Sequence, residues 1–410
     1  MTADSRAALP ALVQVWGLVT VALCLAALVI DGLDYQLLAL TAPLIMAEWA
    51  VARADFGTAM AAALFGMAFG AAGGGWLGDR IGRVRALALS VILFGCATMA
   101  VSRTGEIAPL AALRVLGGIG FGAAGPNALA LACEWMPLRF RTYVVALLSV
   151  GTPAGGMIGA AALPALLPSL GWRGVFLSLG IAAVALGAVL VGVLRNPAHE
   201  ARSAVGARSL LSAPFARLNI GVGLSFAALI AISYGLNAWM PSFLTAAGFT
   251  LEQALAASFA FNACSILGAF AAGWLARAQG SRRVMLGSAV LTAVLLVSFG
   301  VTLDAAPGAR AAIDALAASV GFAASVGITT LYAMAALLYP PEVRAGGIGL
   351  GMTSGRIGGI AMSFAGGYLL DFADGSASVL FGVLAAAAIV ATTAGWLVRR
   401  HIPAHGLEVS

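Results

Sequence analysis

The chain has 410 residues, of which 61% are hydrophobic and 9% are charged, and its mean hydropathy is +1.01. Soluble domains carry about 25% charged residues, so this composition excludes a soluble protein and indicates a chain whose main solvent is lipid. The formal charge is +6, but the 22 basic residues are all arginines and most lie between apolar runs. Anionic lipid therefore explains them better than nucleic acid.

Apolar runs of roughly 20 residues, the length that crosses a bilayer, follow one another along the whole chain. The first run is too long for the core of a signal peptide, so we expect it to be retained as a helix. The predicted spans lie approximately at residues 14–42, 57–77, 84–102, 107–133, 143–168, 172–194, 218–245, 251–275, 284–303, 311–338, 345–370 and 376–398.

These spans predict an all-α membrane protein with two six-helix bundles, at residues 1–195 and 218–410, joined by a central loop at 196–217. With the N-terminus in the cytoplasm, the loops on that side hold 16 arginines and the outer loops hold 4. Positively charged loops stay in the cytoplasm, so we expect both termini there, in a multi-pass protein of a bacterial inner membrane. The four cysteines lie in apolar runs without disulfide or zinc spacing, so no metal or cofactor is expected.

The two halves repeat one another. Gly75-Trp76-Leu77 leads to Arg85, and Gly273-Trp274-Leu275 leads to Arg283, at a constant offset of 198 residues. Each copy falls between the second and third spans of its half. Parallel repeats of this kind are typical of secondary transporters, whose substrate site lies near the membrane midplane.

The first copy, from Gly75 to Arg85, resembles the loop signature of the major facilitator superfamily, G-x-L-[AG]-D-[RK]-x-G-[RK]-x-[RK]. The second copy keeps glycines and arginines, but Arg277 stands where Asp79 stands in the first. The resemblance implies twelve helices in two pseudo-symmetric bundles and a cytoplasmic latch of salt bridges.

Within this superfamily, the chain is similar to the aromatic acid:proton symporters, whose first helix carries D-G-x-D, here Asp31 to Asp34. Four further motifs of that family follow in order: Arg114 before a glycine-rich run, Glu134-Trp135-Met136-Pro137-Leu138-Arg139, Trp239-Met240-Pro241, and Tyr339 to Arg344 followed by Gly355-Arg356-Ile357-Gly358. The resemblance spans nearly the whole chain. It implies import of a small aromatic carboxylate, such as a benzoate or hydroxybenzoate, together with protons, by a protein expected to be monomeric.

Charged residues inside the spans are the candidate proton and substrate sites, because such residues are costly in lipid and usually functional. Asp31 and Asp34 share a helix face, and a carboxylate pair is suited to binding and releasing a proton. No span contains a histidine that could replace them. Arg114 matches their depth, so we favour an ion pair with Asp34 over substrate binding. The alternative to proton binding by Asp31 and Asp34 is that one of these aspartates only neutralises an arginine.

Arg356 lies near the midplane, where a guanidinium can bind a carboxylate in a bidentate manner. An interhelix salt bridge explains it equally well. Tyr35, Tyr234, Trp239 and Tyr332 are candidates for stacking on an aromatic substrate, although packing is the safer reading for each one.

The family resemblance assigns the latch to the cytoplasmic loops. Asp79, Arg80, Arg83, Glu134 and Arg139 are its candidate residues. Glu134 lies about 20 residues beyond Arg114 and hence near the cytoplasmic face. We prefer a place in the latch for it over proton transfer.

Several alternatives remain open at this stage. The chain could be a symporter for another organic acid, such as a dicarboxylate or sugar acid, or a proton-driven exporter. Gly151 to Gly156 is similar to the antiporter signature of drug exporters, but its proline lies one residue too close to the glycine pair. A membrane enzyme is poorly supported because no catalytic motif is present, and the tails are too short for the signalling domain of a sensor.

Overall fold

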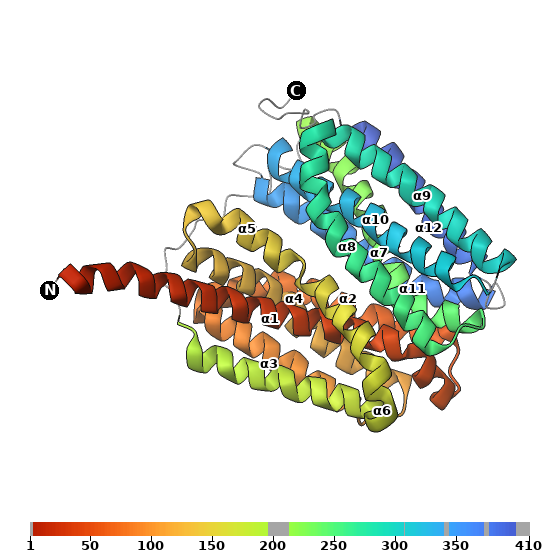
Figure 1. Ribbon diagram of the computed structural model, residues 1–410, viewed down its shortest axis with the longest axis horizontal. Coiled ribbons are helices and arrows are strands. Elements are labelled where there is room, and N and C mark those ends of the chain that lie inside the picture. Colours follow the sequence, from red (N-terminus) through yellow and green to blue (C-terminus); the bar gives the residue numbers. More distant parts are fainter. Residues whose placement is uncertain (1–2, 196–212, 307, 340–343, 373–376, 399–410) are drawn as a thin grey trace. The chain divides into compact units, whose positions relative to one another are not determined.

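The computed structural model describes residues 3–195, 213–306, 308–339, 344–372 and 377–398, and every regular element in these ranges is a helix. Apolar runs form helices in lipid because each backbone polar group must be satisfied within its own segment. The helices are shown in Figure 1: α1 Ala3–Trp49, α2 Arg53–Ile81, α3 Arg83–Val101, α4 Ile107–Trp135, α5 Leu138–Ser149, α6 Gly151–Val193, α7 Ala213–Ala246, α8 Leu251–Gln279, α9 Ser281–Ala305, α10 Arg310–Leu338, α11 Arg344–Phe372 and α12 Ser378–Leu397.

Ten segments of the described chain are long and apolar enough to cross a membrane. One of them, Tyr143–Val193, has 51 residues, too many for a single crossing of a core about 30 Å thick. Gly171 divides it, because its backbone (φ 62°, ψ 173°) is not helical and suits only glycine. The chain turns back there (Figure 1). With these two crossings and the 29-residue helix α11, the described chain accounts for the twelve predicted spans.

The predicted span at 143–168 was wrong in one respect. The helix begins earlier, at Leu138, and is interrupted at Val150, where α5 gives way to α6. Pro153 explains the break, since its ring collides with the carbonyl group four residues earlier, that of Ser149. Helix α1 is longer than predicted at both ends, because it continues beyond the apolar stretch from which the prediction was made.

The chain forms two compact units, which are described separately. Unit 1 comprises Met1–Leu37, Ala62–Gly156 and Ala165–Arg202, and unit 2 comprises Leu38–Ala61, Met157–Pro164 and Ser203–Ser410. The division into bundles at 1–195 and 218–410 stays a prediction. Most of the central loop, residues 196–212, lies outside the described residues, and α7 begins at Ala213.

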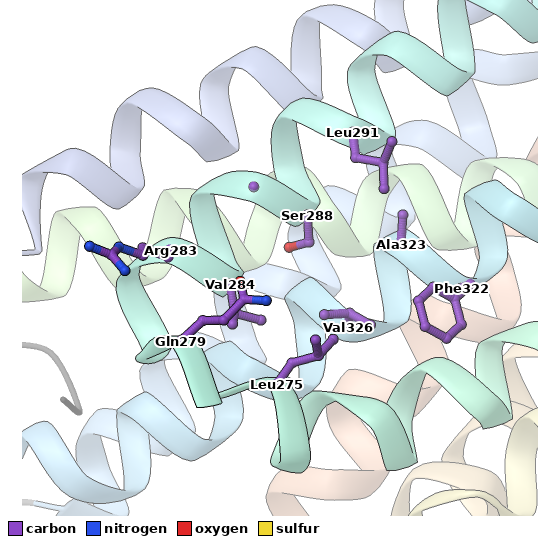
Figure 2. Close-up of a pocket in the computed structure, with 10 residues that line it drawn as sticks. Leu275, Gln279, Arg283, Val284, Ser288, Leu291, Phe322, Ala323 and Val326 are labelled. Carbon is purple, nitrogen blue, oxygen red and sulfur yellow. The ribbon is translucent and has the colours of Figure 1, made fainter. Parts of the chain in front are cut away.

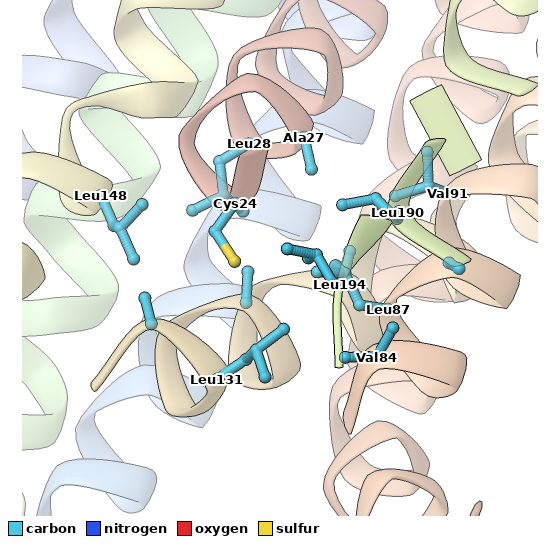
Figure 3. Close-up of a cluster of buried hydrophobic side chains, with 14 of the residues drawn as sticks. Cys24, Ala27, Leu28, Val84, Leu87, Val91, Leu131, Leu148, Leu190 and Leu194 are labelled. Carbon is cyan, nitrogen blue, oxygen red and sulfur yellow. The ribbon is translucent and has the colours of Figure 1, made fainter. Parts of the chain in front are cut away.

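The core of unit 1 is a cluster of apolar side chains from α1, α3, α4, α5 and α6. Figure 3 shows Cys24 among leucines and valines of these helices. Leu87, Leu131 and Leu190, from three different helices, are fully buried in it. Cys24 is buried among these apolar side chains, as its place in an apolar run predicted.

Helices α2 and α4 of unit 1 approach one another backbone to backbone. A Cβ atom on any of several glycines would collide with a carbonyl oxygen of the facing helix. These pairs are Gly66 with Val115, Gly118 with Ala63, Gly70 with Ile119, and Gly122 with Met67. Small residues permit this approach where lipid supplies no hydrophobic force between helices. The glycines after Arg114 are therefore packing residues, and their G-x-G-x-x-G spacing has no nucleotide-binding context.

In unit 2, α8 packs against α10, α7 against α11, and α9 against α12. Trp239 on α7 is fully buried, and its Nε1 donates a hydrogen bond to the Ser363 carbonyl oxygen of α11 at 3.0 Å. Pro241 lies inside α7, which continues past it. The W-x-P motif therefore fastens α7 to α11.

Candidate functional site

Asp34 forms a buried ion pair with Arg114 in unit 1, although Arg114 Nε has no hydrogen-bond partner among the described residues. Asp34 Oδ2 lies 3.1 Å from Nη1 of Arg114, and both side chains are 4% exposed. Arg114 Nη2 also donates to the Asp34 backbone carbonyl oxygen, and Thr98 on α3 donates its hydroxyl to Oδ1. A buried ion pair is stable only when further hydrogen bonds satisfy its remaining atoms. Asp34 and Arg114 are thus held by α1, α3 and α4 together.

Asp31, one turn earlier on α1, has different hydrogen-bonding surroundings. It is 2% exposed, yet its Oδ1 has no hydrogen-bond partner among the residues that the structure describes. An unpaired carboxylate in an apolar interior is costly when charged, and binding a proton removes that cost. The two aspartates of the D-G-x-D motif therefore differ in their surroundings, and the sequence did not show which of them would carry a proton.

The glycine between these aspartates lets α6 reach α1. A Cβ atom on Gly32 would collide with the backbone of Thr152, and one on Gly155 would collide with the Val29 carbonyl oxygen. A Cβ on Gly156 would meet the buried side chain of Gln36. The segment that is similar to an antiporter signature thus packs against α1 and shields Asp31 from solvent.

A second charged cluster lies at the end of α2 and the start of α3. Arg83 Nε lies 2.6 Å from Glu134 Oε1, and Arg83 Nη2 lies 3.5 Å from Asp79 Oδ1. The Arg83 side chain is 21% exposed, so these ion pairs are only partly shielded from water. Arg80 stacks over the Trp76 ring, at 4.3 Å from its centroid. Four of the five predicted latch residues thus lie in this cluster. Asp79, Arg80 and Arg83 belong to the sequence signature, and Glu134 lies at the end of α4.

Asn127 supports this cluster from α4. It is fully buried, and its Nδ2 donates to the carbonyl oxygens of Gly74 and Ala123, both at 2.8 Å. A Cβ on Gly78 would collide with its side chain, so the small residue of the signature is needed here. The fifth candidate, Arg139, lies on α5, and its side chain is outside the described part of the chain.

Arg356 is in the middle of α11 in unit 2 and is partly buried. It forms no ion pair with any residue that the structure describes, and it is close enough to Tyr332 on α10 to interact electrostatically. Glycines beside it let α11 touch α7, since a Cβ on Gly358 would collide with the Ala227 carbonyl oxygen. Arg356 thus lies on a helix that packs closely against α7, and its guanidinium has no carboxylate partner among the described residues.

Two of the predicted aromatic ligands lie on or against the helices around α11. Tyr332 is 37% exposed and packs edge-on against Phe226, with ring centroids 4.8 Å apart. Tyr234 is half-buried and faces Gly359, where a Cβ would lie 3.3 Å from its ring. Tyr332 thus interacts with Arg356, Tyr234 contacts the same helix at Gly359, and Trp239 is buried in packing. Tyr35, in unit 1, lies 6.0 Å from the Phe121 ring.

Several polar residues were missed by sequence reasoning. Thr98 completes the coordination of Asp34, and Asn262 donates to the side-chain oxygen of Asn237 at 3.3 Å across α8 and α7. In unit 2, Arg53 at the start of α2 lies 3.4 Å from Asp371 at the end of α11. The only signal available was a polar residue in an apolar run, which does not identify its partner.

Charged side chains held inside helices that cross a membrane are typical of ion, proton and solute pathways. The Major Facilitator Superfamily pattern matches residues 24–307 and 256–408. The chain belongs to this superfamily, which confirms the predicted family, the all-helical fold and the assignment as a multi-pass membrane transporter.

The relatives also confirm the predicted resemblance to aromatic acid transporters. The chain is 30% identical to the 4-hydroxybenzoate transporter PcaK of Pseudomonas aeruginosa, over 90% of this chain and 90% of the relative. It is 31% identical to the 3-(3-hydroxy-phenyl)propionate transporter of Escherichia coli, over 88% of this chain and 89% of the relative. Among solved structures, a D-xylose-proton symporter matches with a TM-score of 0.74 at 18% identity, covering 92% of this chain and 96% of that one. The last similarity supports the fold alone.

Proposed function

We propose that the protein imports a small aromatic carboxylate, of the benzoate or hydroxybenzoate type, together with protons and by alternating access. The observation that carries this proposal is the division of charges inside the membrane. Among the described residues, Oδ1 of the buried Asp31 in unit 1 has no hydrogen-bond partner, and Arg356 in unit 2 forms no ion pair. Relatives named as transporters of gallate and of 4-hydroxybenzoate support the substrate class.

Asp31 is the proton carrier in this proposal. Asp34 is neutralised by Arg114 and bonded by Thr98, so a proton would have to displace those contacts. Asp31 Oδ1 has no such contact to lose. Glu134 is a weaker candidate because it is already paired with Arg83. Arg114 was a candidate both for substrate binding and for pairing with Asp34, and in this proposal it holds Asp34.

Arg356 binds the substrate carboxylate in this proposal. A guanidinium offers two parallel donors to two coplanar oxygens, and Arg356 is not neutralised by a protein carboxylate among the described residues. Tyr332 has ring surface exposed beside it, on which an aromatic ring can stack. Tyr234, which contacts α11 at Gly359, is a second candidate for contact with the substrate ring. Tyr35 and Trp239 stay predicted ligands, and neither has a described contact with Arg356.

The electrical cost of moving an anion into a cell favours coupling its import to that of a proton. Moving one anion into a cell against a potential of 100 mV costs about 2.3 kcal/mol. One proton per monovalent carboxylate cancels this cost and leaves the pH gradient as the driving force. The Arg83 ion pairs with Glu134 and Asp79 serve as the latch that holds one conformation, on the side of the arginine-rich loops, which we place in the cytoplasm.

Uptake of labelled 4-hydroxybenzoate and benzoate into membrane vesicles tests the proposal. We expect accumulation with an inward proton gradient and its collapse when a protonophore is added. A dicarboxylate and a sugar acid serve as comparison substrates, and vesicles loaded with the aromatic acid test for export. Proton-driven uptake of a comparison acid alone, or proton-driven loss of the loaded acid, would contradict the proposal.

A further inference from the structure

A cavity of about 150 Å³ opens between α8, α9 and α10 in unit 2. Figure 2 shows Arg283 at one end and Phe322 at the other. Leu275, Val284 and Val326 form its apolar wall. The hydroxyl of Ser288 is already engaged, since it donates to the Met285 carbonyl oxygen at 2.9 Å. The cavity is therefore apolar inside, with polar side chains at one end.

Three arginines lie where α8 ends and α9 begins, and one of them, Arg283, lines the cavity. Arg277, Arg282 and Arg283 are exposed, and none of them forms an ion pair with a residue that the structure describes. Arg282 lies over the Trp396 ring, at 5.1 Å from its centroid. Three positive charges thus remain without a counter-ion from the described chain.

The repeat explains how this loop became basic. At the constant offset of 198 residues, Asp79 corresponds to Arg277 and Arg83 corresponds to Ser281. The first loop uses that aspartate and arginine for an ion pair. The second loop has a cation in place of the aspartate and a serine in place of the arginine, so it cannot form the same ion pair.

Apolar side chains on the surface of α8 and α9 continue from the cavity. Leu291 lines it and is 49% exposed, while Trp274 is 71% exposed on the neighbouring helix. Further exposed apolar residues on these helices are Leu267, Phe270, Val290, Val294 and Val297. In a membrane protein such a surface faces acyl chains, so the cavity opens where lipid is the neighbour.

We propose that this cavity and loop bind one anionic phospholipid. Part of an acyl chain fills the cavity, and the phosphate contacts Arg283, with Arg277 and Arg282 adding positive charge. A cavity of this volume holds a group about the size of benzene, which is a segment of a chain rather than a whole lipid. Arginine is the side chain best suited to phosphate, and basic pockets between membrane helices bind anionic headgroups. The inference does not depend on the proposed substrate.

Purified full-length protein can be compared in phosphatidylglycerol and in phosphatidylcholine with the same acyl chains. We expect the thermal midpoint to be about 2–4 °C higher with phosphatidylglycerol. We also expect native mass spectrometry to detect one phosphatidylglycerol retained after delipidation. Equal midpoints and equal retention for the two lipids would overturn the proposal.

Two variants separate the charge from the cavity. Arg283→Gln should weaken phosphatidylglycerol retention about fivefold. Gly287→Leu places a side chain at the cavity, where a Cβ atom has open space, and should remove the retained lipid. Arg310→Gln is the matched control, because it removes one exposed arginine elsewhere in unit 2. Equal retention by Arg283→Gln and Arg310→Gln would refute the headgroup site, and unchanged retention by Gly287→Leu would refute the acyl-chain site.

Discussion

The two units differ in how the charged side chains inside their membrane-spanning helices are paired. Unit 1 contains an acid–base pair, Asp34 with Arg114, whose atoms are supported by Thr98, and a second acid, Asp31, beside it. Unit 2 contains Arg356, which has tyrosines near it and no ion pair among the described residues. The comparison teaches that a paired charge serves as scaffold, whereas an unpaired charge is available to a proton or a ligand.

Breaking the scaffold should have the largest effect. Asp34→Asn leaves Arg114 as a buried charge without its carboxylate, which costs about 3–5 kcal/mol in the free energy of unfolding. We expect a lower thermal midpoint and little folded protein. The double variant Asp34→Asn with Arg114→Gln removes both charges and should recover part of the stability. A single variant as stable as the unmodified protein would show that the pair is not structural.

Removing the unpaired cation should affect binding rather than folding. Arg356→Gln should raise KM for an aromatic carboxylate about 10- to 100-fold, since a charge-assisted hydrogen bond contributes about 1.5–3 kcal/mol. Arg356→Lys should retain part of the affinity because it keeps the charge. The thermal midpoint serves as the folding control. An unchanged KM in a folded Arg356→Gln protein would exclude the arginine from substrate binding.

Removing the unpaired acid should uncouple transport. Asp31→Asn keeps the size of the side chain and leaves no ion pair broken, so the protein should fold normally. Accumulation should fall about 50-fold for each 100 mV of driving force that the proton no longer transmits. Exchange of labelled for unlabelled substrate, which needs no proton gradient, should continue. Full proton-driven accumulation in this variant would assign the proton to another group.

The latch should give the smallest effect, because its charges are partly exposed. Glu134→Gln weakens the contact with Arg83, and exposed ion pairs contribute about 0.2–1 kcal/mol. We therefore expect the transport rate to change by no more than about fivefold. Ser149→Ala, an exposed position on α5 that is away from these charges, is the matched control. A loss as large as that of Asp31→Asn would show that Glu134 belongs to the proton path.

The fold was readable from the sequence because lipid imposes one simple requirement, a run of apolar residues long enough to cross it. The same requirement makes a charged residue in such a run conspicuous, which is how Asp31, Asp34, Arg114 and Arg356 were found. Matching depth on neighbouring helices also pointed to the pair of Asp34 with Arg114, which the structure contains.

The partners of individual side chains could not all be predicted, because they depend on how each helix is rotated about its axis. The sequence predicted the pair of Asp34 with Arg114, but neither the hydrogen bond from Thr98 to Asp34 nor the lack of a partner for Asp31 Oδ1 among the described residues. The ion pair of Arg53 with Asp371 joins residues more than 300 positions apart. None of these outcomes follows from composition or spacing, because each depends on which neighbour a helix face meets.

The direct approach of α2 to α4 has a mechanical consequence. Where Gly66 meets Val115 and Gly118 meets Ala63, no layer of side chains separates the two backbones. Side chains absorb small displacements by changing rotamer, and this interface has almost none that could do so. A displacement of either helix should therefore pass to the other at nearly full amplitude, and flexibility in unit 1 must come from interfaces that contain longer side chains.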